Sequence, residues 1–341
     1  MIRILVVDDS ALMRQVLREL FAGSPDMQVV GEASNGQAGC EKNLALAPDL
    51  VIMDLDMPVL DGVAATARMM AERPVPVFVF SASAESPLGF KALSAGACEV
   101  LRKPDIDKLN DPAFKAGFFG KLRAVAIAAS GAQGIRAAYK RPGNTPMANP
   151  KAVVIGASTG GPMAVRQLLA ALPVDFPLGI ALVQHLEDGF DEGYARWLGE
   201  ACPLKVCLAG EGPNIFQAGT VLVAPVNRHL VARSGKLVLE DGPKVQNQRP
   251  SVDVLFRSAA VAYGPGILGV LLTGMGRDGA DGCKEIVGAG GHTLVQDQES
   301  SAIFGMPKAA IEQGGASEVL PLASIASRLT ILARSRGIGS L

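Results

Sequence analysis

The sequence lacks the features that mark several large classes of protein. Its five cysteines are scattered and include no C-x-x-C pair: Cys40, Cys98, Cys202, Cys207 and Cys283. They are typical of reduced thiols in a cytosolic protein rather than of a disulfide framework or a zinc site. Lysine and arginine total 32 against 33 aspartate and glutamate residues, which leaves a net charge of -1. This balance gives no broad attraction to nucleic acid or to an anionic membrane, so neither is expected as a partner.

Membrane-spanning runs are also missing. The opening MIRILVVDD reaches two acids after a short apolar stretch, which does not predict a signal peptide. Residues 258–276 carry no formal charge but contain five glycines and a proline, so they are interpreted as a helix end, a turn and a buried strand. No membrane insertion is expected. With 49% hydrophobic and 19% charged residues, the 341-residue chain can bury the cores of two domains.

Residues 1–125 alternate short apolar runs with helical patterns. Strands are predicted at RILVVDD, MQVVGEAS, DLVIMDLD, PVFVFSAS and CEVLRKP, and a helix follows each, the first one capped by Ser10. Continuous apolar strands separated by helices predict a parallel sheet covered on both faces. Five such units predict a doubly wound, flavodoxin-like α/β domain.

A second α/β domain is predicted over residues 151–341. Residues 126–150 are rich in Ala, Gly, Ser and Pro and end in YKRPGNTPMANP, so they are predicted to be a linker. Beyond them, AVVIGAS, GIALVQH, KVCLAG, GILGVLLTG, HTLVQD and SEVLPL alternate with helical stretches. This rhythm predicts a doubly wound, Rossmann-like domain with a mainly parallel sheet. A hairpin is expected to interrupt it at TVLVAPVNRHLVARSGKLVLED, residues 220–241.

Four of the five strands expected in the first half end in residues that can do chemistry: Asp8 and Asp9, Asp54, Ser81 and Lys103. Parallel strands bring their carboxyl ends to one edge of a sheet. Three carboxylates gathered there repel one another unless a cation lies among them, and oxygen ligands suit Mg²⁺. A carboxylate supported in this way can accept a phosphoryl group, while an ammonium and a hydroxyl contact its oxygens.

Each of these residues taken alone also has an ordinary explanation. Asp8 and Asp9 fit a turn, Asp54 fits a loop cap, and Lys103 fits a solvated surface charge. Their joint placement at the carboxyl ends of successive strands favours the functional interpretation.

The first half resembles the receiver domain of two-component response regulators in four segments: VVDDSALMR, MDLDMPVLDG, FSAS and RKP. The resemblance covers roughly the first 120 residues and implies phosphorylation of Asp54. It also implies the surrounding ligands: Asp8, Asp9, Asp54 and the Asp56 main-chain carbonyl for Mg²⁺, and Ser81 and Lys103 for the phosphoryl group. The sequence departs from the family at Val100, where receivers usually have Tyr or Phe.

The second half carries a serine on a glycine-rich turn between a predicted strand and a predicted helix. Residues 156–160, GASTG, fit the G-x-S-x-G pattern, whose small neighbours expose the Ser158 Oγ and whose main-chain N–H groups can stabilise an oxyanion. A turn of this kind can equally cradle a phosphate or a dinucleotide. The G-x-G-x-x-G pattern is missing and no acid clearly ends the second strand, yet the turn alone supports both interpretations about equally.

A nucleophilic serine needs a base, and the chain has three histidines. His185 ends the strand that follows the serine-bearing strand, so the two side chains can meet at one sheet edge. His229 lies in the expected hairpin, and His292 begins its strand at the opposite edge. Position therefore favours His185, although a surface-loop capping histidine is the plain alternative.

The histidine in turn needs an acceptor that fixes its tautomer. The loop LLTGMGRDGADG supplies Asp278, just beyond a strand end, and Asp281, which falls in the following helix; Asp297 ends a further strand. Asp278 is favoured, and its plain alternative is an acid that stabilises a helix N-terminus.

The order Ser-His-Asp differs from the Ser-Asp-His order of α/β-hydrolases. The second half instead resembles the catalytic domain of chemotaxis-type protein-glutamate methylesterases in five segments: VIGASTGGP, LVQH, RPSVDVLFRSAA, LLTGMGRDGADG and FGMPKAA. One segment, APVNRHL, departs from the usual APGDRHL-like turn. The resemblance implies Ser158 as nucleophile, His185 as general base and Asp278 as orienting acid. Thr159 and Met275 lie where the family has further active-site residues, and the Met275 main chain is implied as an oxyanion donor.

With its receiver, the whole chain resembles the chemotaxis response regulator methylesterase/glutaminases. The resemblance implies phosphorylation-regulated hydrolysis of glutamate methyl esters, and deamidation of glutamines, on chemoreceptor cytoplasmic helices, which gives adaptation. The implied partners are methyl-accepting chemoreceptors and a chemotaxis histidine kinase as phosphodonor, and no cofactor is expected for the ester step. The receiver is expected to restrain the esterase until it is phosphorylated.

Three other classes stay open from the residues. A DNA-binding regulator would need a basic helix-turn-helix output, whereas this output is glycine-rich and near neutral. A nucleotide-dependent oxidoreductase would use the glycine-rich turn for phosphate. A silent adaptor would only bind receptors.

Overall fold

The computed structural model describes residues 1–83, 87–109, 111–129, 149–211, 214–233 and 235–335. Most of the expected linker, residues 130–148, and the end of the expected second domain, residues 336–341, lie outside the described residues. The chain divides into two compact units, Met1–Gly134 and Ile135–Leu341.

The first unit alternates strands and helices along the chain. Its elements are β1 (Ile2–Val7), α1 (Ala11–Ala22), β2 (Met27–Ala33), α2 (Gly36–Leu46), β3 (Leu50–Met53), α3 (Gly62–Glu72), β4 (Val77–Ser81), α4 (Pro87–Ser94), β5 (Glu99–Arg102), α5 (Ile106–Leu109) and α6 (Pro112–Ala129). Helix starts follow from capping: Ser10, Asn35 and Asp61 each accept a hydrogen bond from a main-chain N–H three residues later. Helix α6 continues into the first residues of the segment expected to be a linker.

The sheet of this unit is parallel, with the strand order β2-β1-β3-β4-β5. This is the flavodoxin-like order, in which ligands collect beyond the carboxyl ends of the strands where the order reverses, here between β1 and β3. Strands β3 and β4 are buried along their whole length because helices cover both faces of the sheet.

The second unit carries a larger sheet. Its elements are β6 (Ala152–Ala157), α7 (Gly161–Ala170), β7 (Gly179–Gln184), α8 (Asp191–Gly199), β8 (Lys205–Leu208), β9 (Asn214–Ile215), β10 (Thr220–Val223), β11 (His229–Arg233), β12 (Lys236–Glu240), α9 (Val252–Tyr263), a 3₁₀ turn (Gly264–Gly266), β13 (Ile267–Leu271), α10 (Ala280–Gly288), β14 (His292–Gln296), α11 (Met306–Glu312), β15 (Glu318–Leu320) and α12 (Leu322–Ala333).

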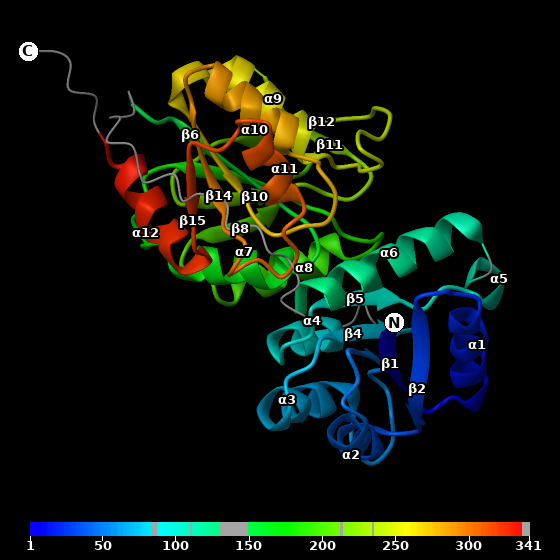
Figure 1. Cartoon of the computed structure of the whole chain (residues 1–341). Coiled ribbons are helices and arrows are strands. Elements are labelled where there is room, and N and C mark those ends of the chain that lie inside the picture. Colours follow the sequence, from blue (N-terminus) through cyan, green and yellow to red (C-terminus); the bar gives the residue numbers. More distant parts are fainter. Residues whose placement is uncertain (84–86, 110, 130–148, 212–213, 234, 336–341) are drawn as a thin grey trace, which may run out of the picture. The chain divides into compact units, whose positions relative to one another are not determined.

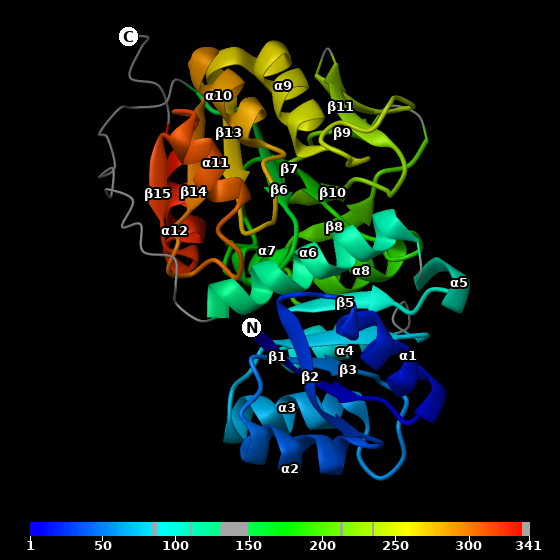
Figure 2. The same cartoon turned by 45° about the vertical axis from the view of Figure 1, so that its right-hand side comes forward.

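Seven of these strands form one parallel sheet in the order β15-β14-β13-β6-β7-β10-β8. Helices α9, α10 and α11 cover one face, and α7, α8 and α12 cover the other (Figures 1 and 2). The order reverses at β6, which lies between β7 and β13. The predicted fold class, two doubly wound α/β domains with mainly parallel sheets, is confirmed.

The expected hairpin is shorter than predicted. Strand β10 belongs to the parallel sheet, where it pairs with β7 and β8. The hairpin itself consists of β11 and β12, and β9 pairs antiparallel with β12 to extend it to a small third sheet. The prediction for residues 220–223 was wrong because the partners of β10 lie far away in the sequence, whereas a hairpin prediction relies on neighbouring runs.

No helix within the described part of the chain is long and apolar enough to span a lipid bilayer.

Candidate functional site

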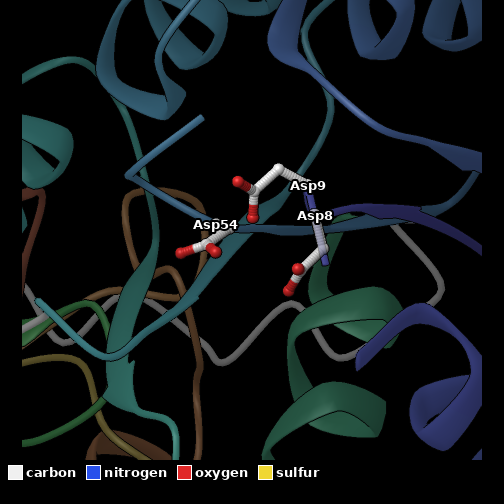
Figure 3. A group of neighbouring side chains, drawn as sticks. All are labelled: Asp8, Asp9 and Asp54. Carbon is white, nitrogen blue, oxygen red and sulfur yellow. The ribbon is translucent and has the colours of Figure 1, made fainter. Parts of the chain in front are cut away.

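The first candidate site lies at the carboxyl edge of the five-stranded sheet. Asp8 and Asp9 follow β1 and Asp54 follows β3 directly. One carboxylate oxygen from each lies within 4.8 Å of the others, and Figure 3 shows the three side chains grouped at these strand ends. Asp8 and Asp54 are buried, whereas Asp9 is exposed. Two of the acids are therefore fixed in the protein interior, and the third faces solvent.

Lys103 joins this group from the end of β5. Its Nζ lies 2.7 Å from Asp8 Oδ2 and 2.5 Å from Asp54 Oδ2. Burial raises the pKa of the Asp8 carboxyl, and the hydrogen bond from Lys103 opposes that rise. Three carboxylates and one ammonium leave two negative charges, and their oxygen donors fit the requirements of Mg²⁺. The two other expected contributors differ in burial: Ser81 is buried at the end of β4, and Asp56 is exposed just beyond Asp54.

The second candidate site lies at the carboxyl edge of the seven-stranded sheet. Ser158 follows β6 on a tight turn that leads into α7. Its N–H donates to Thr273 O at 3.0 Å, and its carbonyl accepts from Gly161 N at 2.7 Å. Gly160 has a φ of 74°, and a Cβ there would meet the Ala302 Cβ at 2.4 Å, so the turn requires glycine. The chain folds here into the strand-turn-helix that the G-x-S-x-G pattern predicts.

His185 follows β7, the neighbour of the serine-bearing strand. Its main-chain N–H donates to Ala157 O at 3.1 Å, which continues the parallel ladder to the residue before Ser158. The imidazole Nε2 lies 2.8 Å from Asp278 Oδ2. The other ring nitrogen, Nδ1, is buried and has no hydrogen-bond partner in the described part of the chain. Strand pairing therefore holds the imidazole and Ser158 at the same edge, as the sequence predicts.

Asp278 lies beyond β13, on the other side of β6. Its carboxylate accepts four hydrogen bonds: from His185 Nε2 and Val252 N on Oδ2, both at 2.8 Å, and from Ser251 Oγ at 2.8 Å and Asp253 N at 2.9 Å on Oδ1. Burial alone would raise the pKa of Asp278, but the hydrogen bond with His185 and those from Asp253 and Ser251 outweigh burial and hold the pKa below its ordinary value. Asp278 is thus ionised at neutral pH.

An ionised carboxylate only accepts hydrogen bonds, so His185 Nε2 carries the proton. In the neutral form of the ring, Nδ1 is then the acceptor. The geometry leaves a free basic nitrogen on a histidine that is oriented by a buried carboxylate. Groups of this kind act as general bases toward a serine hydroxyl.

Two main-chain N–H groups beside the serine are free to bind an oxyanion. Those of Thr159 and Met275 make no hydrogen bond within the described residues. A Cβ added to Gly274 would lie 2.8 Å from the Ser158 Cβ, so the chain segment that carries Met275 runs close against the serine. Main-chain N–H groups of this kind at a strand-end turn can stabilise an oxyanion.

The other two histidines have different surroundings. His229 Nδ1 accepts from Ser251 N at 3.2 Å, and its Nε2 donates to Pro243 O at 3.0 Å, so both ring nitrogens hold main chain in place. His292 begins β14 at the amino edge of the sheet and pairs with the buried Glu318 at 2.8 Å.

The rival acids also point elsewhere. Asp281 lies in α10 and pairs with Arg257 at 3.2 Å. Asp297 accepts two hydrogen bonds from Ser300 within its own loop. Among the weighed candidates, Asp278 is the acid that contacts His185.

The sequence interpretation missed the first turn of α9 as part of this site. Ser251 caps α9 and also donates to Asp278, whose carboxylate faces the N-terminus of that helix. Asp253, completely buried, accepts from Gly279 N at 2.9 Å and Gly282 N at 2.7 Å at the start of α10. Asp278 thus stabilises the start of α9, and Asp253 stabilises the start of α10. The available signal was the N-cap pattern S-V-D before an apolar run.

Comparisons with known proteins agree with both units. The family model described as CheB methylesterase matches residues 153–329, and the one described as Response regulator receiver domain matches residues 4–112. The protein-glutamate methylesterase/protein-glutamine glutaminase 2 of Anaeromyxobacter dehalogenans (strain 2CP-C) is 45% identical over 339 residues, which cover 98% of this chain and 97% of that protein. Protein-glutamate methylesterase/protein-glutamine glutaminase 4 of Myxococcus xanthus (strain DK1622) is 41% identical over 350 residues, covering 98% of each.

A solved structure matches the second unit. The crystal structure of the Thermotoga maritima CheB methylesterase catalytic domain has 39% sequence identity and a TM-score of 0.52, and the match covers 54% of this chain and 99% of that one.

The fold, the two strand-edge sites and these matches define a response regulator whose output unit is of the methylesterase type. The chain belongs to the protein-glutamate methylesterase/protein-glutamine glutaminase family. The predicted family is therefore confirmed, as is the expectation that the chain is an enzyme.

Proposed function

We propose that this chain hydrolyses glutamate methyl esters, and deamidates glutamines, on the cytoplasmic helices of methyl-accepting chemoreceptors, and that phosphorylation of its receiver regulates this activity in chemotactic adaptation. Ser158 is the nucleophile, His185 the general base and Asp278 the orienting acid. The observation that carries the proposal is the 2.8 Å contact between His185 Nε2 and Asp278 Oδ2 at the strand edge that also bears Ser158.

The ester reaction follows from these positions. His185 Nδ1 takes the proton of Ser158 Oγ as that oxygen attacks the ester carbonyl carbon. The main-chain N–H groups of Thr159 and Met275 hold the developing oxyanion. The tetrahedral intermediate collapses, and the methoxy oxygen takes the proton from His185 and leaves as methanol. A water molecule that gives its proton to His185 then hydrolyses the acyl-serine, which releases the glutamate carboxylate and restores Ser158.

Deamidation uses the same steps on a glutamine side chain. The leaving nitrogen takes the proton from His185 and departs as ammonia, and water again releases a glutamate carboxylate. Asp8, Asp9 and Asp54 take no part in either reaction.

The receiver supplies the regulation. Asp54 accepts a phosphoryl group from a chemotaxis histidine kinase, and Ser81 and Lys103 contact that group. Mg²⁺, when bound by Asp8, Asp9, Asp54 and the Asp56 main-chain carbonyl, neutralises charge on the transferred group. Phosphorylation shifts the chain from a less active to a more active state, and each tenfold shift requires about 1.4 kcal/mol of differential stabilisation.

Methanol release from methylated chemoreceptor tests the proposal, with and without a small-molecule phosphodonor. Ser158→Ala and His185→Gln should each abolish methanol release from the full chain. Both variants should still be phosphorylated on Asp54, which controls for loss of fold in the receiver. A Ser158→Ala chain that releases methanol at the wild-type rate would refute the assignment.

A further inference from the structure

One polar side chain lies at the end of an otherwise apolar strand. Strand β7 reads GIALVQ, every residue in it is buried, and its last residue, Gln184, is 2% exposed. An aliphatic residue is the ordinary choice at such a position, because a buried amide is unfavourable unless its hydrogen bonds are satisfied. The contacts of Gln184 show what the amide does there.

The amide nitrogen of Gln184 bridges the two chain segments of the serine site. Nε2 donates to Ser158 O at 2.8 Å and to His185 O at 3.1 Å, so both amide hydrogens go to carbonyls of the nucleophile and the base. Ser158 O also accepts from Gly161 N at 2.7 Å, which occupies its second acceptor direction. The orientation of the Ser158 carbonyl is therefore fixed from two sides.

Fixing that carbonyl also fixes the next N–H group. The peptide unit is planar and trans, so the Thr159 N–H points opposite to the Ser158 C=O. This N–H is one of the two that make no hydrogen bond in the described part of the chain. In a G-x-S-x-G turn the N–H after the nucleophile is the one that faces the oxyanion.

The oxygen of the Gln184 amide is not stabilised in the same way as the nitrogen. Gln184 Oε1 is buried and has no hydrogen-bond partner among the residues that the structure describes. It packs against Gly161, where an added Cβ would lie only 2.3 Å from Oε1. An unpaired buried acceptor is destabilising. The two hydrogen bonds of the NH₂ group are therefore the favourable contribution that this side chain makes here.

We propose that Gln184 is a positioning residue for the esterase reaction. It acts by fixing the Ser158–Thr159 peptide, so that the Thr159 N–H faces the oxyanion, and by tying that peptide to the residue that bears the base. This inference rests on the proposed function, because it assigns Gln184 a role in that same site.

The test compares Gln184→Met with the wild-type full chain in methanol release from methylated chemoreceptor, with a saturating small-molecule phosphodonor. Methionine has a similar length and no N–H group, so both bridging hydrogen bonds are lost while the strand stays apolar. We expect kcat to fall about ten- to a hundredfold with KM changed by less than about threefold, because the lost orientation matters in the transition state. Gln184→Glu, which has the same shape and at most one donor hydrogen, carries the test if the methionine variant fails to fold, as judged by circular dichroism.

Thr293→Val is the matched control. Thr293 is completely buried at the amino end of β14, and its Oγ1 donates to Gly315 O at 2.6 Å and accepts from Ser317 N at 2.8 Å. The control thus removes buried hydrogen bonds at the opposite edge of the same sheet and should lower stability without lowering kcat. A folded Gln184 variant with wild-type kcat, measured beside an inactive Ser158→Ala chain, overturns the inference and leaves the proposed function standing. An active Ser158→Ala chain overturns the proposed function itself.

Discussion

Replacing Asp278 by asparagine should separate its two roles, orienting His185 and stabilising the start of α9. The carboxylate accepts four hydrogen bonds from His185, Ser251, Val252 and Asp253. An amide has one acceptor atom, so its NH₂ group must face either the His185 and Val252 donors or the Ser251 and Asp253 donors. The Ser251 hydroxyl can rotate to accept, but a main-chain N–H cannot, so at least one helix N–H loses its partner in either orientation.

The expected losses follow from that count. Each unpaired buried N–H destabilises by about 1–3 kcal/mol, and the missing charge at a helix N-terminus adds about 0.3–2 kcal/mol. Asp278→Asn should therefore lower the free energy of unfolding by about 1–5 kcal/mol in urea titrations at neutral pH. In either orientation the charge that stabilises the His185 imidazolium is lost. If the NH₂ group faces His185, Nε2 also becomes the acceptor and Nδ1 carries the proton, so kcat for methanol release should fall by about 10²–10⁴.

The stability effect also has a pH signature. The pKa of Asp278 is lowered in the folded chain, so its contribution is present above the unfolded value near pH 4 and is lost as the pH falls through the folded value. The difference in unfolding free energy between wild type and Asp278→Asn should therefore be largest near neutral pH and shrink in acid.

Asp281→Asn is the matched control for Asp278→Asn. Asp281 lies three residues away, at the start of α10, where its carboxylate is partly exposed and pairs with Arg257. Its replacement should change the unfolding free energy by less than about 1 kcal/mol and leave kcat unchanged. Wild-type kcat in a folded Asp278→Asn chain would refute the assigned role of the carboxylate.

Three further predictions test other parts of the molecule. The isolated 151–341 fragment should release methanol faster than the unphosphorylated full chain, and Asp54→Asn should make the full chain unresponsive to phosphodonor; equal rates from fragment and full chain would exclude restraint by the receiver. Val59 is β-branched, 83% exposed and has a φ of 71°, so Val59→Gly should raise the unfolding free energy of the receiver by about 0.5–1 kcal/mol in urea titrations, and a decrease would show that the strain argument is wrong. Burial raises the pKa of Asp253 to about 6, so its ionisation destabilises the folded chain as the pH rises from about 4 through 6. Asp253→Asn should remove that loss and be more stable than wild type at pH ~7.5 by about 3 kcal/mol in urea titrations, and a less stable variant would contradict the argument.

The sequence was enough to predict the two parallel sheets, except for strand β10, and the edge at which each candidate site lies. Parallel strands place their last residues together, so Ser158 after β6, His185 after β7 and Asp278 after β13 could be assigned to one edge from their positions in apolar runs. The same rule predicts the grouping of Asp8 and Asp54.

The surroundings of the site were harder to predict because they depend on contacts between distant segments. Ser251 and Asp253 meet Asp278 only because α9 packs beside α10, and no local pattern indicates that packing. Gln184 ends an apolar strand and looks like the first polar residue of a loop, so its burial was not predictable. Strand β10 was assigned to a hairpin because its partners, β7 and β8, are remote in the sequence.

The place of β6 between β7 and β13 has a consequence for how the enzyme is made. Synthesis on the ribosome adds the residues of the serine turn well before β13, which lies directly beside β6 in the sheet and begins only at Ile267. A nascent or truncated polypeptide that stops before this strand holds Ser158 and His185 but lacks Asp278, the proposed orienting acid, and lacks the strand that pairs with one edge of β6. Long-range strand pairing of this kind forms late in folding, so the proposed site is complete only when the last quarter of the polypeptide has been made.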